Sequence, residues 1–353
     1  MKTLTLPLLM LIAGVSFTSC RKHTSSPDNT GDNSPTQGPY LYVGGNTINA
    51  KAAYWKKSLS QPNTITLRDT LTDGKNITSI VTSGSDIYMS VFGTNGGYWK
   101  NNTLVTLPNC SSVSNITLSG TTVYASGWDK MLNLAYWIGN TKYTLDNPYN
   151  LFPDMGVGSS GLTGIALSGP NVLVSGSLSV SNRLGAPANA LDGDFGMVWA
   201  NGNLSLLGKG GLPIFNYHST VGIAVAGADV YVAGRFPDTT HVGGYWKNRV
   251  WDNVNNGAFL PSSIITSGSD VYIAGATYTR NPVYSQQAAY WVNGNLIQLT
   301  GSVATAIAVD GQDVYILGID NNNKVVVWKN GNNVFTTIGS DPDVGADCIA
   351  IGN

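Results

Sequence analysis

Residues 263–300, SIITSGSDVYIAGATYTRNPVYSQQAAYWVNGNLIQLT, contain four short segments rich in β-branched and aromatic residues. The first two, SIITSG and DVYIAG, flank a Gly-Ser-Asp turn that begins at Gly268. The last two, AAYWVNG and NLIQLT, flank Asn293-Gly294, a strong two-residue hairpin signal. Because such residues favour strands and such turns join antiparallel neighbours, this stretch predicts one sheet of four antiparallel strands.

The same unit recurs along the chain, so internal repetition defines the architecture. Blocks that resemble Gly-x-Asp-Val-Tyr-x-x-Gly, with the aspartate variable, begin at Gly38, Gly84, Gly120, Gly169, Gly227, Gly268 and Gly311. Each block is followed by an aromatic block that ends in tryptophan, at Trp55, Trp99, Trp137, Trp199, Trp246, Trp291 and Trp328. Radially arrayed four-stranded units form a β-propeller. The sequence predicts an all-β, seven-bladed propeller, with six or eight blades as the alternatives.

The two ends of the repeat region complement one another. The first unit starts at its second strand, PYLYVGG, without a preceding first strand. The chain ends in ADCIAIGN (346–353), which matches first strands of other units such as GLTGIALSG and STVGIAVAG. We therefore expect the C-terminal segment to supply the missing strand and to close the ring.

The adjacent Tyr290 and Trp291 raise the question of whether the aromatic pair binds a ligand or fills a core. Successive strand residues point to opposite faces, and both faces of a propeller blade pack against neighbouring blades. Seven copies at equivalent positions fit a structural need better than seven ligand platforms. We expect the two rings to fill opposite inter-blade gaps, since large aromatics dominate burial energetics.

The N-terminus predicts a targeting segment rather than part of the fold. Lys2 precedes an apolar stretch, 4–17, that is too short for a good membrane span. It ends in Phe-Thr-Ser-Cys, which resembles the lipobox of bacterial lipoproteins and implies cleavage before Cys20 and lipid attachment to its thiol. An ordinary secretory signal is the alternative. Residues 1–20 are thus a signal peptide, 21–38 a flexible tether rich in polar residues, and 39–353 the propeller domain.

Composition narrows the class of function. The net charge is −1, only 11% of the 353 residues are charged, and all 20 acidic residues are aspartates. The electrostatic footprint of nucleic-acid binding is missing. No cofactor motif is present. Cys110 and Cys348 fall on non-neighbouring units, which favours two free, buried thiols in a monomeric domain.

Connection lengths indicate where a ligand could bind. The connections between strands two and three, and from strand four into the next unit, are long and irregular, whereas the others are short. Variable loops on a rigid scaffold are the usual place for binding, and packing onto the disc is the alternative role of their side chains. The non-repeating candidates on these loops are Trp128, Asp129, Phe152, Arg183, Tyr217, His218, Arg235, Tyr278 and Arg280.

Catalysis and metal binding have weaker signals. No Gly-x-Ser-x-Gly elbow, phosphate-binding glycine loop or His-Glu-x-x-His helix occurs. Asp192 and Asp194 in a glycine-containing loop are a weak candidate for calcium. A carbohydrate-active enzyme, hydrolase or lyase, would have to use loop aspartates as its acid and base, because the chain has no glutamate. This reading is the alternative to a binding module.

The repeated GxDVYxxG and AxYWKNG blocks resemble those of bacterial β-propeller lipoproteins without an assigned activity. The resemblance covers roughly residues 39–353 and implies the fold and a place in the cell envelope, on the outer membrane where one exists; it carries no chemistry across. We expect a lipid-anchored, extracytoplasmic binding or scaffold module whose long loops face a glycan or protein ligand. A structural envelope protein without a small ligand is a further alternative.

Overall fold

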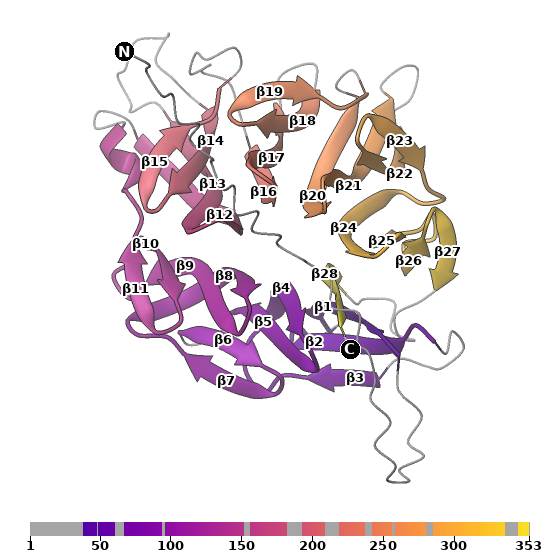
Figure 1. The fold of residues 1–353 in the computed structure, drawn as a ribbon, viewed down its shortest axis with the longest axis horizontal. Helices are drawn as coiled ribbons and strands as arrows, with labels where there is room; N and C mark the ends of the chain where they lie inside the picture. The colour runs from indigo at the N-terminus through magenta and orange to yellow at the C-terminus, as the bar shows by residue number, and fades with distance from the viewer. Residues whose placement is uncertain are drawn as a thin grey trace, which may run out of the picture. The chain divides into compact units, whose positions relative to one another are not determined.

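The computed structural model describes residues 38–47, 49–60, 67–93, 96–151, 156–181, 193–208, 219–236, 242–255, 258–279, 285–335 and 345–352. These residues form seven separate four-stranded antiparallel sheets that stand as blades around a common centre (Figure 1). The seven-bladed propeller predicted from the repeats is therefore confirmed. The one helix among them is a short 3-10 turn, η1 (Pro148–Leu151), and it is not long enough to span a membrane.

Each blade is a meander whose first strand lies innermost. Blade 1 contains β1 (Tyr40–Asn46), β2 (Ala52–Ser58), β3 (Leu67–Thr70) and the C-terminal β28 (Gly345–Gly352). Blade 2 contains β4 (Asn76–Ser83), β5 (Asp86–Phe92), β6 (Gly97–Lys100) and β7 (Thr103–Thr106). Blade 3 contains β8 (Cys110–Ser119), β9 (Thr122–Asp129), β10 (Leu134–Ile138) and β11 (Thr141–Thr144). Blade 4 contains β12 (Gly156–Ser168), β13 (Asn171–Ser181), β14 (Gly193–Ala200) and β15 (Asn203–Leu206).

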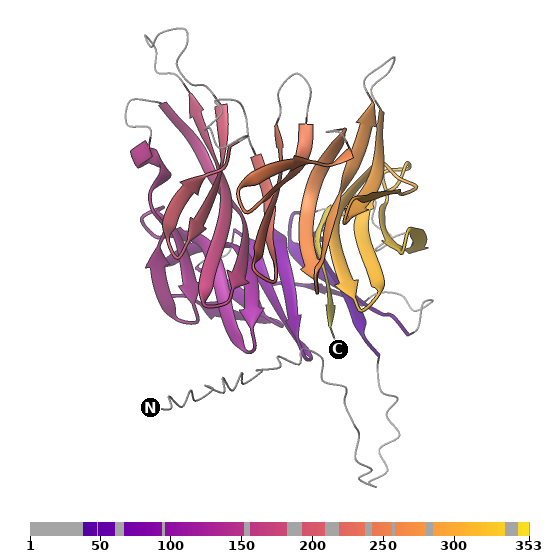
Figure 2. The same cartoon turned by 45° about the horizontal axis from the view of Figure 1, so that its top comes forward.

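The remaining blades follow the same order. Blade 5 contains β16 (Ser219–Ala226), β17 (Asp229–Phe236), β18 (Val242–Lys247) and β19 (Val250–Asn253). Blade 6 contains β20 (Phe259–Ser267), β21 (Asp270–Thr279), β22 (Ser285–Val292) and β23 (Asn295–Gln298). Blade 7 contains β24 (Val303–Asp310), β25 (Asp313–Ile319), β26 (Val325–Lys329) and β27 (Asn332–Phe335). In the tilted view the long strands of each blade run side by side across the thickness of the ring (Figure 2).

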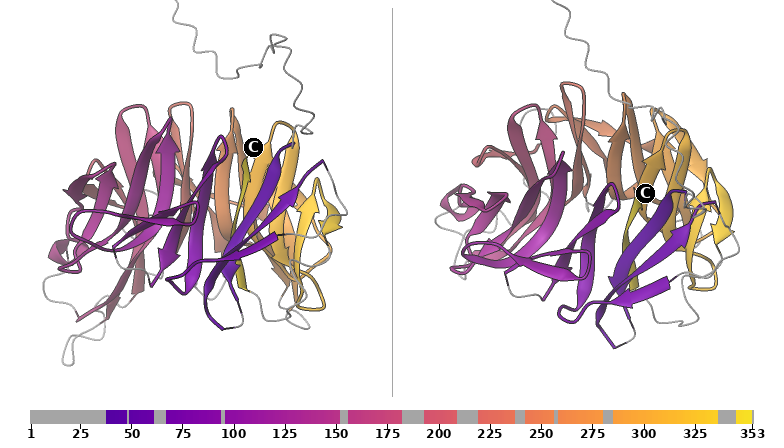
Figure 3. Two further views of the ribbon diagram at one scale, coloured as in Figure 1. Left: turned by 90° about the horizontal axis from the view of Figure 1, so that it is seen from below. Right: turned by 60° about the horizontal axis from the view of Figure 1, so that its bottom comes forward.

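The ring is closed by the two ends of the propeller sequence. β28 pairs antiparallel with β1, from Tyr40 opposite Gly352 to Asn46 opposite Gly345. The C-terminal strand thus becomes the innermost strand of blade 1, beside the N-terminal strands (Figure 3). This pairing confirms the closure expected from the missing first strand.

The core lies between the blades. The buried apolar side chains of the described residues form seven clusters, one for each pair of adjacent blades, and each cluster contains one of the seven repeated tryptophans. Trp291 packs in the cluster between blades 5 and 6, and Tyr290 packs in the cluster between blades 6 and 7. The prediction that neighbouring aromatics fill opposite gaps is confirmed.

The recurring Asp and Asn of the two motifs form a structural clamp. In blade 6 the Asn293 amide donates to Asp270 Oδ1 at 2.7 Å and its oxygen accepts the Val271 backbone N–H at 3.0 Å. The same two bonds recur in blades 2, 5 and 7. Each clamp ties the turn between strands three and four to the start of strand two, which explains why these residues repeat.

Candidate functional site

The blades present two different ends. Because each blade is a meander, the short turns between strands one and two and between strands three and four lie together at one end, the short-turn end. The connections between strands two and three and those between blades lie at the other, the long-loop end. Many of the long connections fall outside the described residues, and with them seven predicted site residues, namely Cys20, Phe152, Arg183, Asp192, Tyr217, His218 and Arg280.

Asp129 is a buried loop anchor at the end of β9. It is 1% exposed, and its Oδ1 accepts the backbone N–H groups of Met131 and Asn133 at 2.9 and 3.0 Å. Its Oδ2 pairs with the Lys142 ammonium at 2.5 Å. Burial alone would raise the pKa of Asp129, but the Lys142 ammonium and the two N–H groups outweigh burial and lower that pKa to about 2. Both oxygens of the carboxylate are therefore engaged in contacts that stabilise the loop after β9.

The two aromatic candidates that the structure describes are packed. Trp128 is half-buried and lies against the apolar cluster between blades 3 and 4. Tyr278, near the end of β21, is 8% exposed. Both side chains therefore contribute mainly to packing beneath the long-loop end, the alternative that the sequence had left open.

Of the two aspartates in the weak candidate calcium site, the structure describes Asp194 and not Asp192. Asp194 accepts a hydrogen bond from the Ser179 hydroxyl on the neighbouring strand. No group of three or more metal-ligating side chains occurs among the residues that the structure describes.

Arg235 differs from these residues because one of its guanidinium donors, Nε, is buried without a hydrogen-bond partner among the described residues. It lies near the end of β17, opposite Ser219 and Gly243, at the long-loop end. Alternation along β17 places its side chain on the same face as Tyr231 and Ala233, which pack between blades 5 and 6. Its Nε is buried without a hydrogen-bond partner, and the described residues supply no ion pair to it. Burial lowers the pKa of this guanidinium below its ordinary value.

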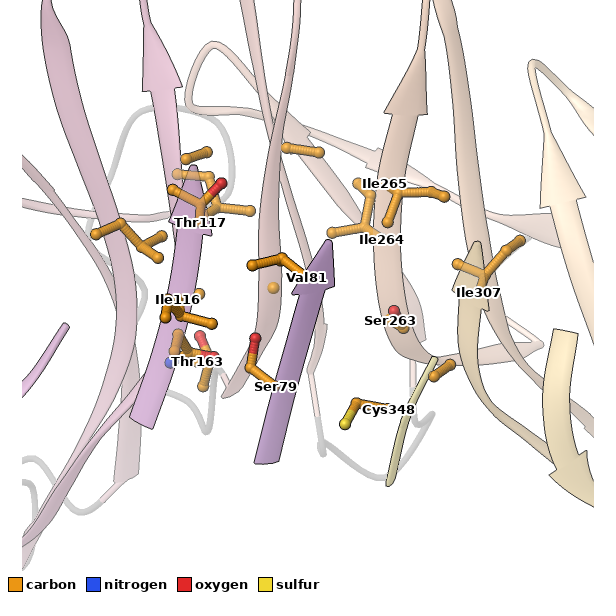
Figure 4. A pocket seen from close by; sticks show the side chains of 18 of the residues that line it. Ser79, Val81, Ile116, Thr117, Thr163, Ser263, Ile264, Ile265, Ile307 and Cys348 are labelled. Carbon is orange, nitrogen blue, oxygen red and sulfur yellow. The ribbon is translucent and has the colours of Figure 1, made fainter. Parts of the chain in front are cut away.

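A channel of about 520 Å³ runs through the centre of the ring, lined by the innermost strand of every blade (Figure 4). Each of these strands pairs on one side only. The lining of the channel is largely neutral. Isoleucines at equivalent positions are accompanied by hydroxyl groups such as those of Ser79, Thr117 and Ser263. Asp347 is the single carboxylate in the lining, and it accepts the Asn76 amide at 2.7 Å. The channel thus offers hydroxyls and one acid, from residues that sequence reasoning had treated only as strand.

A β-bulge recurs in the strands that line the channel. In every innermost strand the pairing register shifts by one residue near the long-loop end. The extra residues are Thr78, Ser114, Thr163, Val221, Ser262, Thr305 and Asp347. In blade 2 the Thr78 hydroxyl bonds the Ser90 hydroxyl at 2.9 Å and donates to the Ser114 carbonyl of blade 3 at 2.9 Å. The Thr163 hydroxyl likewise lies 2.7 Å from the Thr220 hydroxyl of blade 5, so two of the bulges link neighbouring blades through hydroxyl groups.

Comparison with known proteins supports the fold and nothing finer. No family model matches the chain, and no curated protein matches it. Among solved structures, the β-propeller domain of the trilobed protease from Pyrococcus furiosus matches with a TM-score of 0.53 at 12% identity, over 87% of this chain and 97% of that one. At this identity the likeness shows a shared β-propeller architecture.

Two further solved structures align with lower scores. One is a protein of Bacteroides fragilis described as a candidate 6-phosphogluconolactonase, with a TM-score of 0.46 at 12% identity over 91% of this chain and all of that one. The other is a protein from Lactobacillus plantarum, with a TM-score of 0.48 at 11% identity over 89% of this chain and 99% of that one. Neither alignment bears on what this chain binds.

Proposed function

We propose that this protein is a binding module, anchored outside the cytoplasm by a lipid on Cys20, that captures a carboxylate-bearing glycan or protein at its long-loop end. The observation that carries the proposal is the Nε of Arg235 at that end, which is buried without a hydrogen-bond partner among the described residues. The signal-like N-terminus and the unequal connection lengths support the same arrangement.

A buried donor of a charged group is costly when it has no hydrogen-bond partner, so its retention in a half-buried arginine needs a reason. Arginine presents several N–H donors in a planar fork that matches a carboxylate, and such charge-assisted bonds are among the strongest in proteins. A ligand carboxylate seated beside Arg235 would satisfy the buried Nε and compensate the desolvated charge. The site would therefore prefer acidic ligands over neutral ones.

The test compares Arg235→Leu with Arg249→Ala. Arg249 is an exposed arginine in the β18–β19 turn, at the short-turn end of the same blade, and serves as the matched control. The purified full chain is screened against uronic and sialic acid glycans and against acidic peptides. We expect Arg235→Leu to weaken binding about tenfold or more, since bonds to charged groups contribute most. Equal binding by Arg235→Leu and the parent protein would refute the proposal.

The ligand-free protein offers an independent readout of the same idea. Replacing the arginine with a shorter apolar side chain removes the desolvation cost of the buried Nε. Arg235→Leu should therefore raise the thermal unfolding midpoint without ligand while binding is lost. A lower midpoint combined with unchanged binding would show that the guanidinium serves the fold instead.

The anchor is tested separately. Expressed in a bacterial host with an alkyne-labelled fatty acid, the chain should incorporate label and fractionate with membranes. Cys20→Ser should abolish both. Label-free, soluble protein from the unaltered chain would support the ordinary secretory signal.

A further inference from the structure

A second cleft opens on the rim of the propeller, at the short-turn end between blades 5 and 6. It has a volume of about 470 Å³ and shares no lining residue with the central channel. One part of its lining is aromatic, with Tyr231, Tyr245 and Trp291. Another part is polar and includes Asp252 and Asn293. We call this the rim cleft.

The rim cleft is lined by two charged residues, Lys247 and Asp252, and they do not pair with each other. Lys247 is engaged by Asp229 at 2.7 Å, and the Asn293 amide is held by its clamp. Asp252 is exposed and makes no ion pair among the described residues; its Oδ2 accepts the Tyr245 hydroxyl at 3.0 Å. The cleft therefore presents one uncompensated carboxylate beside a phenol, next to aromatic rings.

The same pair occurs in the gap between blades 1 and 2, where a third group completes it. Tyr54 stands opposite Asp69 as Tyr245 stands opposite Asp252, on strands three and four of the blade. There the Asn102 side chain of the next blade bridges the pair. Its oxygen accepts the Tyr54 hydroxyl at 3.3 Å, and its amide donates to Asp69 Oδ2 at 2.5 Å.

Between blades 5 and 6 that third group is missing. The second residue of the strand three–four turn is Asn102 in blade 2 and Gly294 in blade 6. A Cβ built on Gly294 would meet no atom within 4 Å, so the space taken by an amide in one gap is open in the other. Trp291 is also 8% exposed, against 4% for its counterpart Trp99. The rim cleft thus has the same Tyr–Asp pair as the gap between blades 1 and 2, but it lacks an equivalent of the Asn102 side chain.

We propose that the rim cleft binds one neutral sugar unit, whose hydroxyls take the place of the Asn102 amide. A sugar hydroxyl can donate and accept, so one hydroxyl can donate to Asp252 while its neighbour shares the Tyr245 hydrogen with Asp252, as the Asn102 oxygen shares the Tyr54 hydrogen with Asp69 in the other gap. Trp291 and Tyr231, each 8% exposed, line the cleft, and their exposed parts can contact C–H groups of the sugar beside the polar partners. The Asp252 charge disfavours acidic ligands.

This inference is independent of the ligand proposed for Arg235. The rim cleft carries negative charge and the long-loop site positive charge, so neutral and acidic probes report on the two sites separately. Loss of acidic binding leaves the rim proposal standing, and loss of neutral binding leaves the Arg235 proposal standing.

The experiment titrates the full chain with the methyl glycosides of glucose, galactose and mannose and with N-acetylglucosamine, using ligand-observed NMR and calorimetry. Acetamide tests simple amide binding, and glucuronate tests for charge preference. We expect binding of at least one neutral sugar, weakened about tenfold or more by Asp252→Ala and by Tyr245→Phe. Asp69→Ala, the matched change in the filled gap, should leave sugar binding unchanged.

A gain-of-function variant tests the amide analogy directly. Asn102→Gly empties the gap between blades 1 and 2 at an exposed turn position, and it should raise the calorimetric stoichiometry from one sugar to two. The proposal is overturned if no neutral sugar binds, if acetamide binds in place of every sugar, or if sugar binding survives Asp252→Ala and Tyr245→Phe. A stoichiometry unchanged in Asn102→Gly would also overturn it.

Discussion

Replacing Asp129 with asparagine should destabilise the propeller in a pH-dependent way. The substitution keeps the size of the side chain and an oxygen that can accept a backbone N–H, but it removes the charge that faces Lys142. If Asp129 anchors its own loop, the loss appears in the free energy of unfolding and not in ligand binding.

The magnitude follows from the pKa. A folded-state pKa of about 2, against an ordinary value of about 3.9, corresponds to about 2.5 kcal/mol at neutral pH. Because the Lys142 side chain is 23% exposed, solvent screens part of the interaction, and we expect about 1.5–2 kcal/mol. A lowered carboxyl pKa stabilises the fold above the ordinary value, and this stability disappears as the pH falls through about 2. The difference between parent and Asp129→Asn should therefore shrink to roughly half by pH 3.

The assay is urea unfolding of the two proteins at pH 7, 5, 4 and 3, followed by tryptophan fluorescence. Asp320→Asn is the matched control, because Asp320 accepts the N–H groups of Asn322 and Lys324 in a similar turn but forms no ion pair among the described residues. We expect a smaller loss there. Equal stability of parent and Asp129→Asn at pH 7, or a difference that does not change down to pH 3, would refute the reasoning.

Three further predictions test the packing. A chain that ends before β28 should lose cooperative unfolding and elute as aggregate in gel filtration, whereas removal of the last residue alone should have no effect. Trp137→Phe should cost about 1 kcal/mol more than Trp99→Phe in urea unfolding, because the Trp137 indole donates to a backbone carbonyl at 3.0 Å while the buried Trp99 Nε1 has no described partner. Burial raises the pKa of the Cys110 thiol to about 12 and raises the pKa of the Cys348 thiol further. In a Cys20→Ser chain at pH 8, Cys110 and Cys348 should therefore react with a thiol reagent only after unfolding. Fast labelling of the native chain would contradict their burial.

The architecture could be predicted because it rests on local patterns. Period-two alternation and two-residue turns define each strand and its neighbour, and repetition supplies the blade count. Even the adjacent Tyr290 and Trp291 follow from alternation alone. The closing strand was recognisable because 346–353 has the pattern of a first strand.

The side-chain partners could not be predicted in the same way. Asp129 looked like a loop ligand, although the spacing from Asp129 to Asn133 is also that of a turn whose aspartate accepts nearby backbone N–H groups, the one signal that was available. The rim cleft depends on a difference between Asn102 and Gly294, and both residues read as ordinary turn residues. The difference matters only because a neighbouring blade places a Tyr–Asp pair beside the turn. The sequence of one repeat does not show which residues of the next blade it will contact.

The pairing of β1 with β28 also sets the order in which the chain can finish folding. Blades 2 to 7 are each built from consecutive segments, so each can form as soon as its own residues have been synthesised. Blade 1 contains the earliest strands of the propeller and yet must wait for the latest one. During that interval the inner edge of β1 is an unpaired strand edge of the kind that recruits other chains. Synthesis of β28 therefore removes the exposed edge that β1 created, and chains that stop before β28 retain it.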